Sequence, residues 1–229
     1  MTQPNSEHLD ALLDAALMHV PFDGWSETTF KAAAQDAELE LSLARALCPR
    51  GAVDLAIAFH KRGDAQMVER MNTDALPDRY RDKVAAAVRF RIEAVTDKEA
   101  VRRGTTLFAL PFHAADGAKL IWGTADEIWT ALGDSSDDFN WYSKRAILSG
   151  VYSSTVLFWL GDDSADNQAT WAFLDRRIDN VMQIEKAKSQ VNNSKLLSAM
   201  FSGPNWLLSQ VKAPHKMQDF PGRWTPPQS

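Results

Sequence analysis

The stretch that decides how the chain begins to fold is Gly24-Trp-Ser-Glu-Thr-Thr-Phe-Lys-Ala-Ala-Ala-Gln-Asp-Ala37. Gly24 favours a tight turn, and the Ser26 hydroxyl can cap a helix that starts at residue 27. A short helix over 41–48 and a longer one after it are expected to follow. Residues 1–60 are therefore predicted to form a helix-turn-helix-like N-terminal part.

Helical periodicity continues outward from this stretch, and we find no strand-like alternation of useful length. Helices are expected near 6–19, 27–37, 41–48, 51–72, 78–95, 97–110, 114–132, 139–160, 166–187 and 193–212. Pro21 is expected to follow the first helix, Pro77-Asp78 to open the fifth, and Gly133 to end the seventh. The sequence thus predicts an all-α fold of about ten helices.

The overall composition argues against a broadly basic nucleic-acid-binding protein, a disulfide-stabilised protein and a protein with a membrane-spanning helix. The chain has 229 residues, a net charge of −5 and one cysteine, Cys48. Such an acidic chain is a poor match for whole-surface attraction to nucleic acid, and a single cysteine excludes a disulfide within one chain. No apolar run reaches 18 residues, so we expect no membrane-spanning helix.

The helix-turn-helix resembles the opening of regulators of the tetracycline-repressor type, whose short helix enters the major groove. Here that helix begins beside Glu38 and Glu40, whose carboxylates would repel phosphates. Arg45 and Arg50 are too few to compensate. We expect the motif to serve as scaffold, with no nucleic-acid partner, although a ligand-responsive transcription regulator remains the alternative.

Large aromatic residues gather in the central block of the chain. Five of the eight tryptophans fall within residues 122–171, and the helix over 139–160 is apolar on nearly every face. A helix of this kind is buried or lines a hydrophobic pocket. Plain core packing explains any one of these residues equally well, and their number favours a pocket.

The turn and helix start over 133–145 combine residue types that are frequent in interfaces. Trp141 and Arg145 are four residues apart and share a helical face, and Tyr142 lies beside them. Trp, Tyr and Arg dominate the energetics of protein interfaces. The alternative is a capping Asp138, a buried tryptophan and a solvated arginine.

Two motifs carry a family resemblance. One is Gly-Asp-x-Ser-x-Asp-x-Asn-Trp-Tyr-x-x-Arg-x-x-Leu-x-x-x-Tyr, matched from Gly133 to Tyr152, and the other begins at Thr170-Trp171. Together they resemble the ubiquinone-biosynthesis accessory protein family, the lipid-binding partner of the demethoxyubiquinone hydroxylase. The resemblance covers about residues 7–187.

This resemblance implies a tetracycline-repressor-like fold with a degenerate helix-turn-helix, which binds an isoprenoid quinone intermediate and presents it to a membrane-associated hydroxylase. It implies a lipid-binding core over 61–190, and a possible homodimer through the last two long helices. The partner-binding residues implied are Asp126, Ile128, Asp138, Trp141, Tyr142 and Arg145. The lipid-binding residues expected are Trp122, Trp129, Leu148, Tyr152, Thr155, Val156 and Trp159.

The segment 191–229 is predicted to hold an amphipathic, membrane-associating helix and a loosely ordered tail. Its apolar residues are interrupted by Gly203-Pro204 and surrounded by lysines, a pattern that suits a bilayer interface. Docking on the core, as a lid over the pocket, is the alternative. The membrane-contacting residues expected are Leu197, Met200, Phe201, Trp206 and Leu207.

Catalytic and metal-binding patterns are missing from the sequence. The histidines are scattered, and neither a Glu-x-x-His pair nor a Gly-x-Ser-x-Gly motif occurs. We therefore expect no enzyme activity, no metal and no cofactor. Because Met1–His8 looks like no targeting segment, we expect a bacterial, cytoplasmic protein bound peripherally to the inner face of the membrane.

Overall fold

The computed structural model describes residues 3–95, 97–136 and 139–193, and within these ranges it contains no β-strand. The elements are α1 (Gln3–Asp23), α2 (Glu27–Asp36), α3 (Leu41–Leu47), α4 (Ala52–Thr73), α5 (Tyr80–Glu93), α6 (Lys98–Phe108), α7 (Ala114–Ala131), α8 (Phe139–Leu160), a 3-10 turn (Ala165–Asn167) and α9 (Gln168–Asn193). The predicted all-α fold is confirmed. The helix expected over 193–212 lies, beyond its first residue, outside the described residues.

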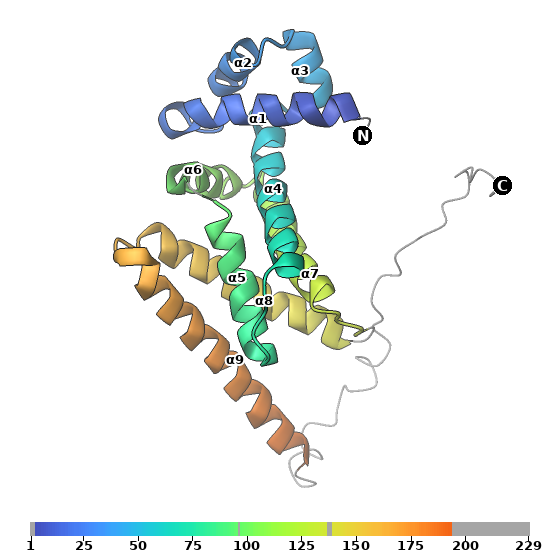
Figure 1. Ribbon diagram of the computed structural model, residues 1–229, viewed down its shortest axis with the longest axis vertical. Helices are drawn as coiled ribbons and strands as arrows, with labels where there is room; N and C mark the ends of the chain where they lie inside the picture. Colours follow the sequence, from blue (N-terminus) through green and yellow to red (C-terminus); the bar gives the residue numbers. More distant parts are fainter. Residues whose placement is uncertain (1–2, 96, 137–138, 194–229) are drawn as a thin grey trace, which may run out of the picture.

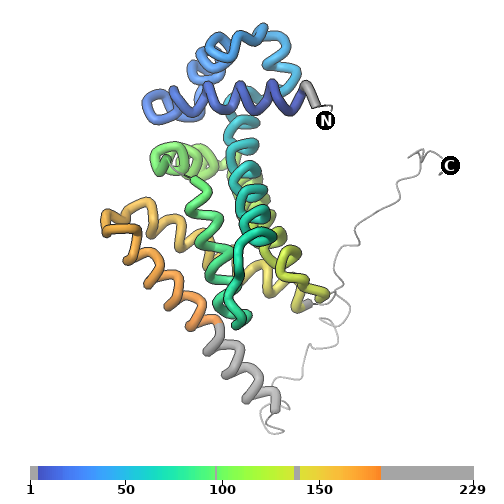
Figure 2. Tube along the Cα trace, viewed as in Figure 1, coloured from blue at the N-terminus to red at the C-terminus, as the bar shows by residue number. Residues whose placement is uncertain are grey.

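The helices form two layers joined by α4 (Figure 1). Helices α1, α2 and α3 pack on one another at one end, and α4 runs from them through the rest of the molecule. There α4 packs against α5 and α7, and α7 packs against α8. The trace in Figure 2 shows α9 running back alongside the second layer, where it contacts α8 and α5.

Each layer has its own hydrophobic core. The first core surrounds Phe30, Leu12 and Leu55, which are fully buried. The second is built mainly from α4, α5, α7, α8 and α9, with Met67 and Ile128 among its fully buried residues. The first core extends onto α6, where Ala100 is fully buried and its carbonyl accepts a hydrogen bond from Trp25 Nε1–H at 3.1 Å.

Two predicted helix ends have the local chemistry that the sequence indicates. The Ser26 hydroxyl accepts a hydrogen bond from the Thr29 amide and caps α2 as predicted. Gly133 follows α7 with a φ of +75°, the left-handed conformation expected of a residue that ends a helix. Both predictions are confirmed.

Two predicted boundaries were wrong. Pro21 lies inside α1, which continues to Asp23 because the Gly24 amide still bonds to the Val20 carbonyl at 2.9 Å. Helix α5 starts at Tyr80 rather than at Pro77-Asp78, since the Arg79 carbonyl is the first to accept helical hydrogen bonds.

No helix in the described ranges is both long enough and apolar enough to cross a bilayer. The predicted membrane-contacting residues lie outside the described residues; they are Leu197, Met200, Phe201, Trp206 and Leu207.

Candidate functional site

A cavity of about 440 Å³ lies where the two cores meet. Trp25, Ala56 and Ala100 reach it from the first core, while Ile92 and Trp159 reach it from the second. Most of its lining is apolar, and exposed lining residues on α6 and α7 leave it open to solvent there. A concave apolar space of this size suits a small apolar ligand.

One wall of the cavity carries a buried polar cluster, which we call the polar end: His60 and Asp64 on α4, Arg91 on α5, Thr124 on α7 and Tyr152 on α8. Arg91 Nε donates to the Asp64 carboxylate at 2.6 Å, and its Nη2 donates to the His60 carbonyl at 3.0 Å. The Thr124 hydroxyl donates to Asp64 at 2.8 Å and also meets His60 Nε2 at 2.9 Å. Arg91, His60 and Tyr152 line the cavity itself.

The protonation states at the polar end follow from burial. Burial and the neighbouring positive charge of Arg91 lower the pKa of His60 to about 4, so its imidazole is uncharged at neutral pH. Burial also raises the pKa of Tyr152, which keeps its phenol protonated. The polar end therefore offers hydrogen bonds from uncharged groups beside one ion pair.

The lipid-binding residues expected from the sequence divide between the cavity and its surroundings. Tyr152, Val156 and Trp159 line the cavity. The other four lie elsewhere: Trp122 packs on Trp141, Trp129 on Tyr80, Leu148 is in the second core, and the buried Thr155 hydroxyl donates to the Val151 carbonyl.

Several residues that line the cavity were not predicted from the sequence. Trp25, Phe59 and His60 precede residue 61, so the cavity extends across the boundary that was predicted for the lipid-binding core. Arg91 lies in a run of charged residues that looks like an ordinary solvated face. The available signal was that His60 and Asp64 are one helical turn apart on α4.

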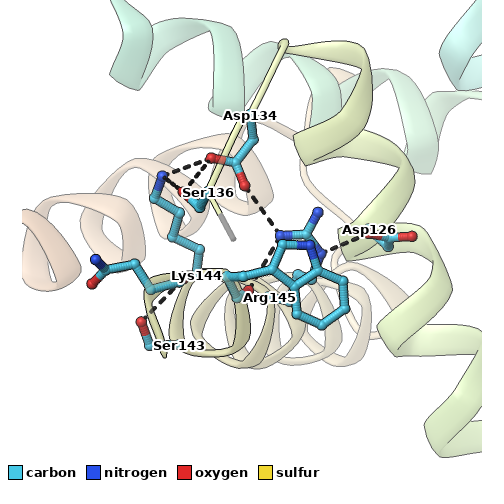
Figure 3. A network of polar contacts seen from close by, with 8 residues as sticks. Asp126, Asp134, Ser136, Ser143, Lys144 and Arg145 are labelled. Atoms are coloured by element: carbon cyan, nitrogen blue, oxygen red, sulfur yellow. Dashed lines mark hydrogen bonds and ion pairs between the residues drawn. The ribbon is translucent and has the colours of Figure 1, made fainter. Parts of the chain in front are cut away.

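A second feature lies at the junction of α7 and α8 (Figure 3). Arg145 is 2% exposed and points between two aspartates, with Nε donating to Asp126 at 2.6 Å and Nη1 to Asp134 at 3.1 Å. Its guanidinium also lies 4.0 Å from the centre of the Trp141 ring. The buried Arg145 therefore packs against the face of the Trp141 ring and does not reach solvent.

Asp134 is the central acceptor of this junction. Lys144 Nζ and the Ser136 hydroxyl each approach it at 2.7 Å, and Lys144 also donates to Ser136 at 2.7 Å. Burial opposes ionisation of Asp134, but hydrogen bonds from Lys144, Ser136 and Arg145 outweigh it and lower its pKa to about 2. The carboxylate thus ties the loop after α7 to the first turns of α8.

The aromatic surface, formed by Trp122, Trp141 and Tyr142, covers this junction. The Trp141 ring lies 4.8 Å from Tyr142 and 5.9 Å from Trp122, and all three side chains are partly exposed. Two of the residues expected to bind a partner are buried, Ile128 and Arg145, whereas Asp126 is partly exposed. Asp138 lies outside the described residues.

Helix α3 presents little that could bind a nucleic acid. Its exposed positions include Leu41 and Leu43. Arg45 forms an ion pair with Glu27, and its guanidinium lies 4.4 Å from the centre of the Phe30 ring. Phosphate contacts rely on available lysine and arginine side chains, which this face does not supply.

Metal ligands do not cluster in residues 3–95, 97–136 and 139–193: no group of three or more His, Cys, Asp or Glu side chains is arranged to hold an ion there.

The sequence matches one family model and several known proteins. Residues 114–185 match the family model COQ9. The ubiquinone biosynthesis protein COQ9 of Drosophila melanogaster, a mitochondrial protein, is 33% identical over 185 residues, covering 78% of this chain and 56% of the relative. The COQ9 proteins of Rattus norvegicus and Homo sapiens are 30% and 28% identical, covering 80% of this chain and 61% and 60% of the relatives.

The chain thus spans less than two thirds of the length of these relatives. Among solved structures, a TetR transcriptional regulator from Nitrosomonas europaea aligns with a TM-score of 0.62 over 75% of this chain and 95% of the regulator. At 17% identity this likeness shows the fold alone, and it confirms the predicted tetracycline-repressor-like architecture.

The comparisons correct one expectation. A bacterial protein at the inner face of a membrane was predicted from the first residues of the sequence. The relatives from Drosophila melanogaster, Rattus norvegicus and Homo sapiens are mitochondrial proteins, so that prediction was wrong. The first residues of a chain carry too little information for such an assignment.

Proposed function

Because the chain carries the COQ9 family region over residues 114–185 and is a relative of COQ9 proteins over 78–80% of its length, we propose that it acts in ubiquinone biosynthesis. It does so without catalysing a reaction itself. It binds an isoprenoid quinone intermediate and presents that lipid to a membrane-associated hydroxylase of the pathway.

The cavity is the observation that carries this proposal. Its volume of about 440 Å³ falls within the usual range of ligand pockets, roughly 300–1,000 Å³. Tyr152, Val156 and Trp159 give it an aromatic and aliphatic wall, and the polar end gives it one hydrogen-bonding site. A lipid with an apolar tail and one polar head group would match these two parts of the cavity.

The aromatic surface is the site at which we place the hydroxylase. Trp141 and Tyr142 are partly exposed, and the buried Arg145 holds the Trp141 ring in place. Rigid, partly exposed aromatic side chains are typical anchors of protein interfaces. Arg145 then acts as a positioning residue, and Trp141, Tyr142 and Asp126 make the contacts.

Two further contacts belong to the proposal. The segment 191–229 binds the membrane surface through its apolar residues, as its sequence pattern indicates. A homodimer forms through α8 and α9, where the exposed Phe158 stacks on Phe173 with ring centres 4.5 Å apart.

Lipid extraction from the purified protein, followed by mass spectrometry, tests lipid binding. Ala118→Trp places a large side chain at the exposed edge of the cavity and should reduce the recovered lipid. Ala115→Trp is the matched control, because Ala115 is exposed on the same helix but does not line the cavity. Recovery of no lipid from the wild type, together with no binding to liposomes, would sink the proposal.

Replacing Trp141 with alanine tests the docking site. Affinity for the hydroxylase should fall by about 2 kcal/mol, or roughly 30-fold, as for a central interface residue. The thermal midpoint should stay nearly unchanged, and a large fall would instead make Trp141 a core residue. Trp171→Ala, on α9, is the control variant for the loss of an indole away from this surface.

The second candidate is a ligand-responsive transcription regulator, which the fold of the Nitrosomonas europaea protein favours. The exposed leucines of α3 and the engaged Arg45 argue against it. A mobility-shift assay at low salt decides between the two functions. Strong binding that weakens steeply with added salt would favour the regulator.

A further inference from the structure

The charges at the polar end are balanced within the described part of the chain. Asp64 contributes one negative charge and Arg91 one positive charge, and the two side chains meet at 2.6 Å. Arg91 is 4% exposed and Asp64 is 9% exposed, so water screens neither of them well. His60 adds no charge at neutral pH, because burial keeps its pKa near 4.

The hydrogen bonds assign the proton of His60. Thr124 has one hydroxyl hydrogen and two acceptors within reach, Asp64 at 2.8 Å and the Leu120 carbonyl at 3.2 Å, and the shorter, charge-assisted bond goes to the anionic Asp64. Its oxygen must then accept a hydrogen bond from His60 Nε2, 2.9 Å away. We assign the neutral imidazole with its proton on Nε2, which leaves Nδ1 as an acceptor.

Arg91 keeps donor capacity beside the cavity. Its guanidinium has five N–H groups, and the bonds to Asp64 and to the His60 carbonyl use two of them. Tyr152 adds a protonated phenol on the same wall. The polar end thus combines donors and an acceptor without a net charge.

An anionic head would be poorly accommodated at such a site. To pair with Arg91 it would have to compete with Asp64, which already holds the guanidinium in a short, charge-assisted bond. Left unpaired, a buried anion is strongly disfavoured beside a second carboxylate. An uncharged head that both donates and accepts hydrogen bonds neither competes with Asp64 for Arg91 nor leaves an unpaired charge buried.

We propose that the polar end selects lipids with an uncharged, hydrogen-bonding head, such as a phenol or an alcohol, over lipids of equal chain length that end in a carboxylate or a phosphate. This inference rests on the proposed function, in which the cavity holds a lipid. His60, Arg91 and Tyr152 contact the head, and the apolar lining holds the chain.

Two probes of equal chain length test this selectivity, 1-dodecanol and dodecanoate. Each is titrated against the full-length protein at pH 7.5 to displace N-phenyl-1-naphthylamine, a neutral apolar dye. The alcohol should bind at least about tenfold more tightly than the carboxylate. Equal or tighter binding of dodecanoate would overturn the inference and leave lipid binding itself intact.

Asp64→Asn sharpens the test, because it leaves Arg91 without its counter-ion. The preference should then invert, and dodecanoate should bind more tightly than dodecanol. Asp14→Asn makes the same chemical change at an exposed ion pair with Arg62 and should keep the wild-type preference. An unchanged preference in a folded Asp64→Asn protein contradicts the inference.

The remaining outcomes are also decisive. If Asp64→Asn does not fold, the ratio measured on the wild type decides. If neither the dye nor either probe binds the wild type, the proposed function fails, and the selectivity inference fails with it. That result differs from equal binding of the two probes, which removes the selectivity alone.

Discussion

Two buried arginines organise the two candidate sites, and they do so in different surroundings. Arg91 and Arg145 are 4% and 2% exposed, and each donates from Nε to an aspartate at 2.6 Å. Arg91 pairs with Asp64 beside an apolar cavity. Arg145 pairs with both Asp126 and Asp134 and lies beneath an indole ring.

The difference shows what a buried ion pair contributes to this protein. Burying two charges costs about as much free energy as their attraction returns, so neither pair is primarily a source of stability. What each pair supplies is a fixed geometry: a charge-balanced wall at Arg91 and an oriented aromatic ring at Arg145. Breaking the pairs should therefore produce distinct effects.

The largest effect is expected from Arg91→Met. It leaves the Asp64 carboxylate buried without its cation, which should lower the free energy of unfolding by about 3–5 kcal/mol. Urea denaturation followed by circular dichroism measures the loss. Arg62→Met, which breaks an exposed pair with Asp14, should cost at most about 1 kcal/mol, and equal losses would contradict the distinction.

The free energy of unfolding, measured as a function of pH, should distinguish the two sites further. The pKa of His60 is lowered from 6.5 to about 4, so the unfolded chain takes up a proton in this range that the folded protein does not. Stability is therefore lost as the pH falls from 6.5 to 4, by about 3 kcal/mol. His60→Gln should remove this loss, whereas His8→Gln should leave it in place.

Asp134→Asn should have a smaller effect, in a more acidic range. The pKa of Asp134 is lowered from 3.8 to about 2, so its contribution is full above pH 3.8 and is lost as the pH falls towards 2. The variant should be about 2 kcal/mol less stable than the wild type at pH 7. A persistent difference at pH 2, or a similar loss in the exposed-site control Asp163→Asn, would contradict this account.

The smallest effect is expected from Ser136→Ala, which removes a hydroxyl that bonds to both Asp134 and Lys144. The expected cost is about 1 kcal/mol in the free energy of unfolding. Ser135→Ala, one residue earlier and exposed, is the matched control and should cost almost nothing. A clear loss of hydroxylase binding in Ser136→Ala would show that the loop geometry also controls the aromatic surface.

The helical fold followed from the sequence because helix starts and stops are local events. The cap at Ser26 and the left-handed Gly133 depend on residues within a few positions of each other. The family resemblance could also be recognised from the sequence, since the motif from Gly133 to Tyr152 lies inside the region that matches the COQ9 model. Pro21 was misplaced because α1 continues past it to Asp23, where the Gly24 amide still bonds to the Val20 carbonyl, even though a proline often ends a helix.

The two candidate sites were harder to predict from the sequence, because they depend on contacts between residues that are distant in the chain. The polar end joins α4, α5, α7 and α8, and periodicity cannot show that Arg91 meets Asp64 across 27 positions. The burial of Arg145 was missed for the same reason, as its partner Asp126 lies on the preceding helix. Trp25 and Phe59 were assigned to a scaffold and instead line the cavity.

The position of the cavity between the two hydrophobic cores has a thermodynamic consequence. A ligand that contacts both cores binds only when both are folded, so occupancy should raise the cooperativity of unfolding and not merely the midpoint. Without ligand, we expect the α1–α3 layer to open as a separate unit and its amides to exchange faster than those of α7 and α8. With a ligand bound, the two layers should exchange their amides as a single unit, so occupancy of the cavity would depend on the integrity of the whole fold.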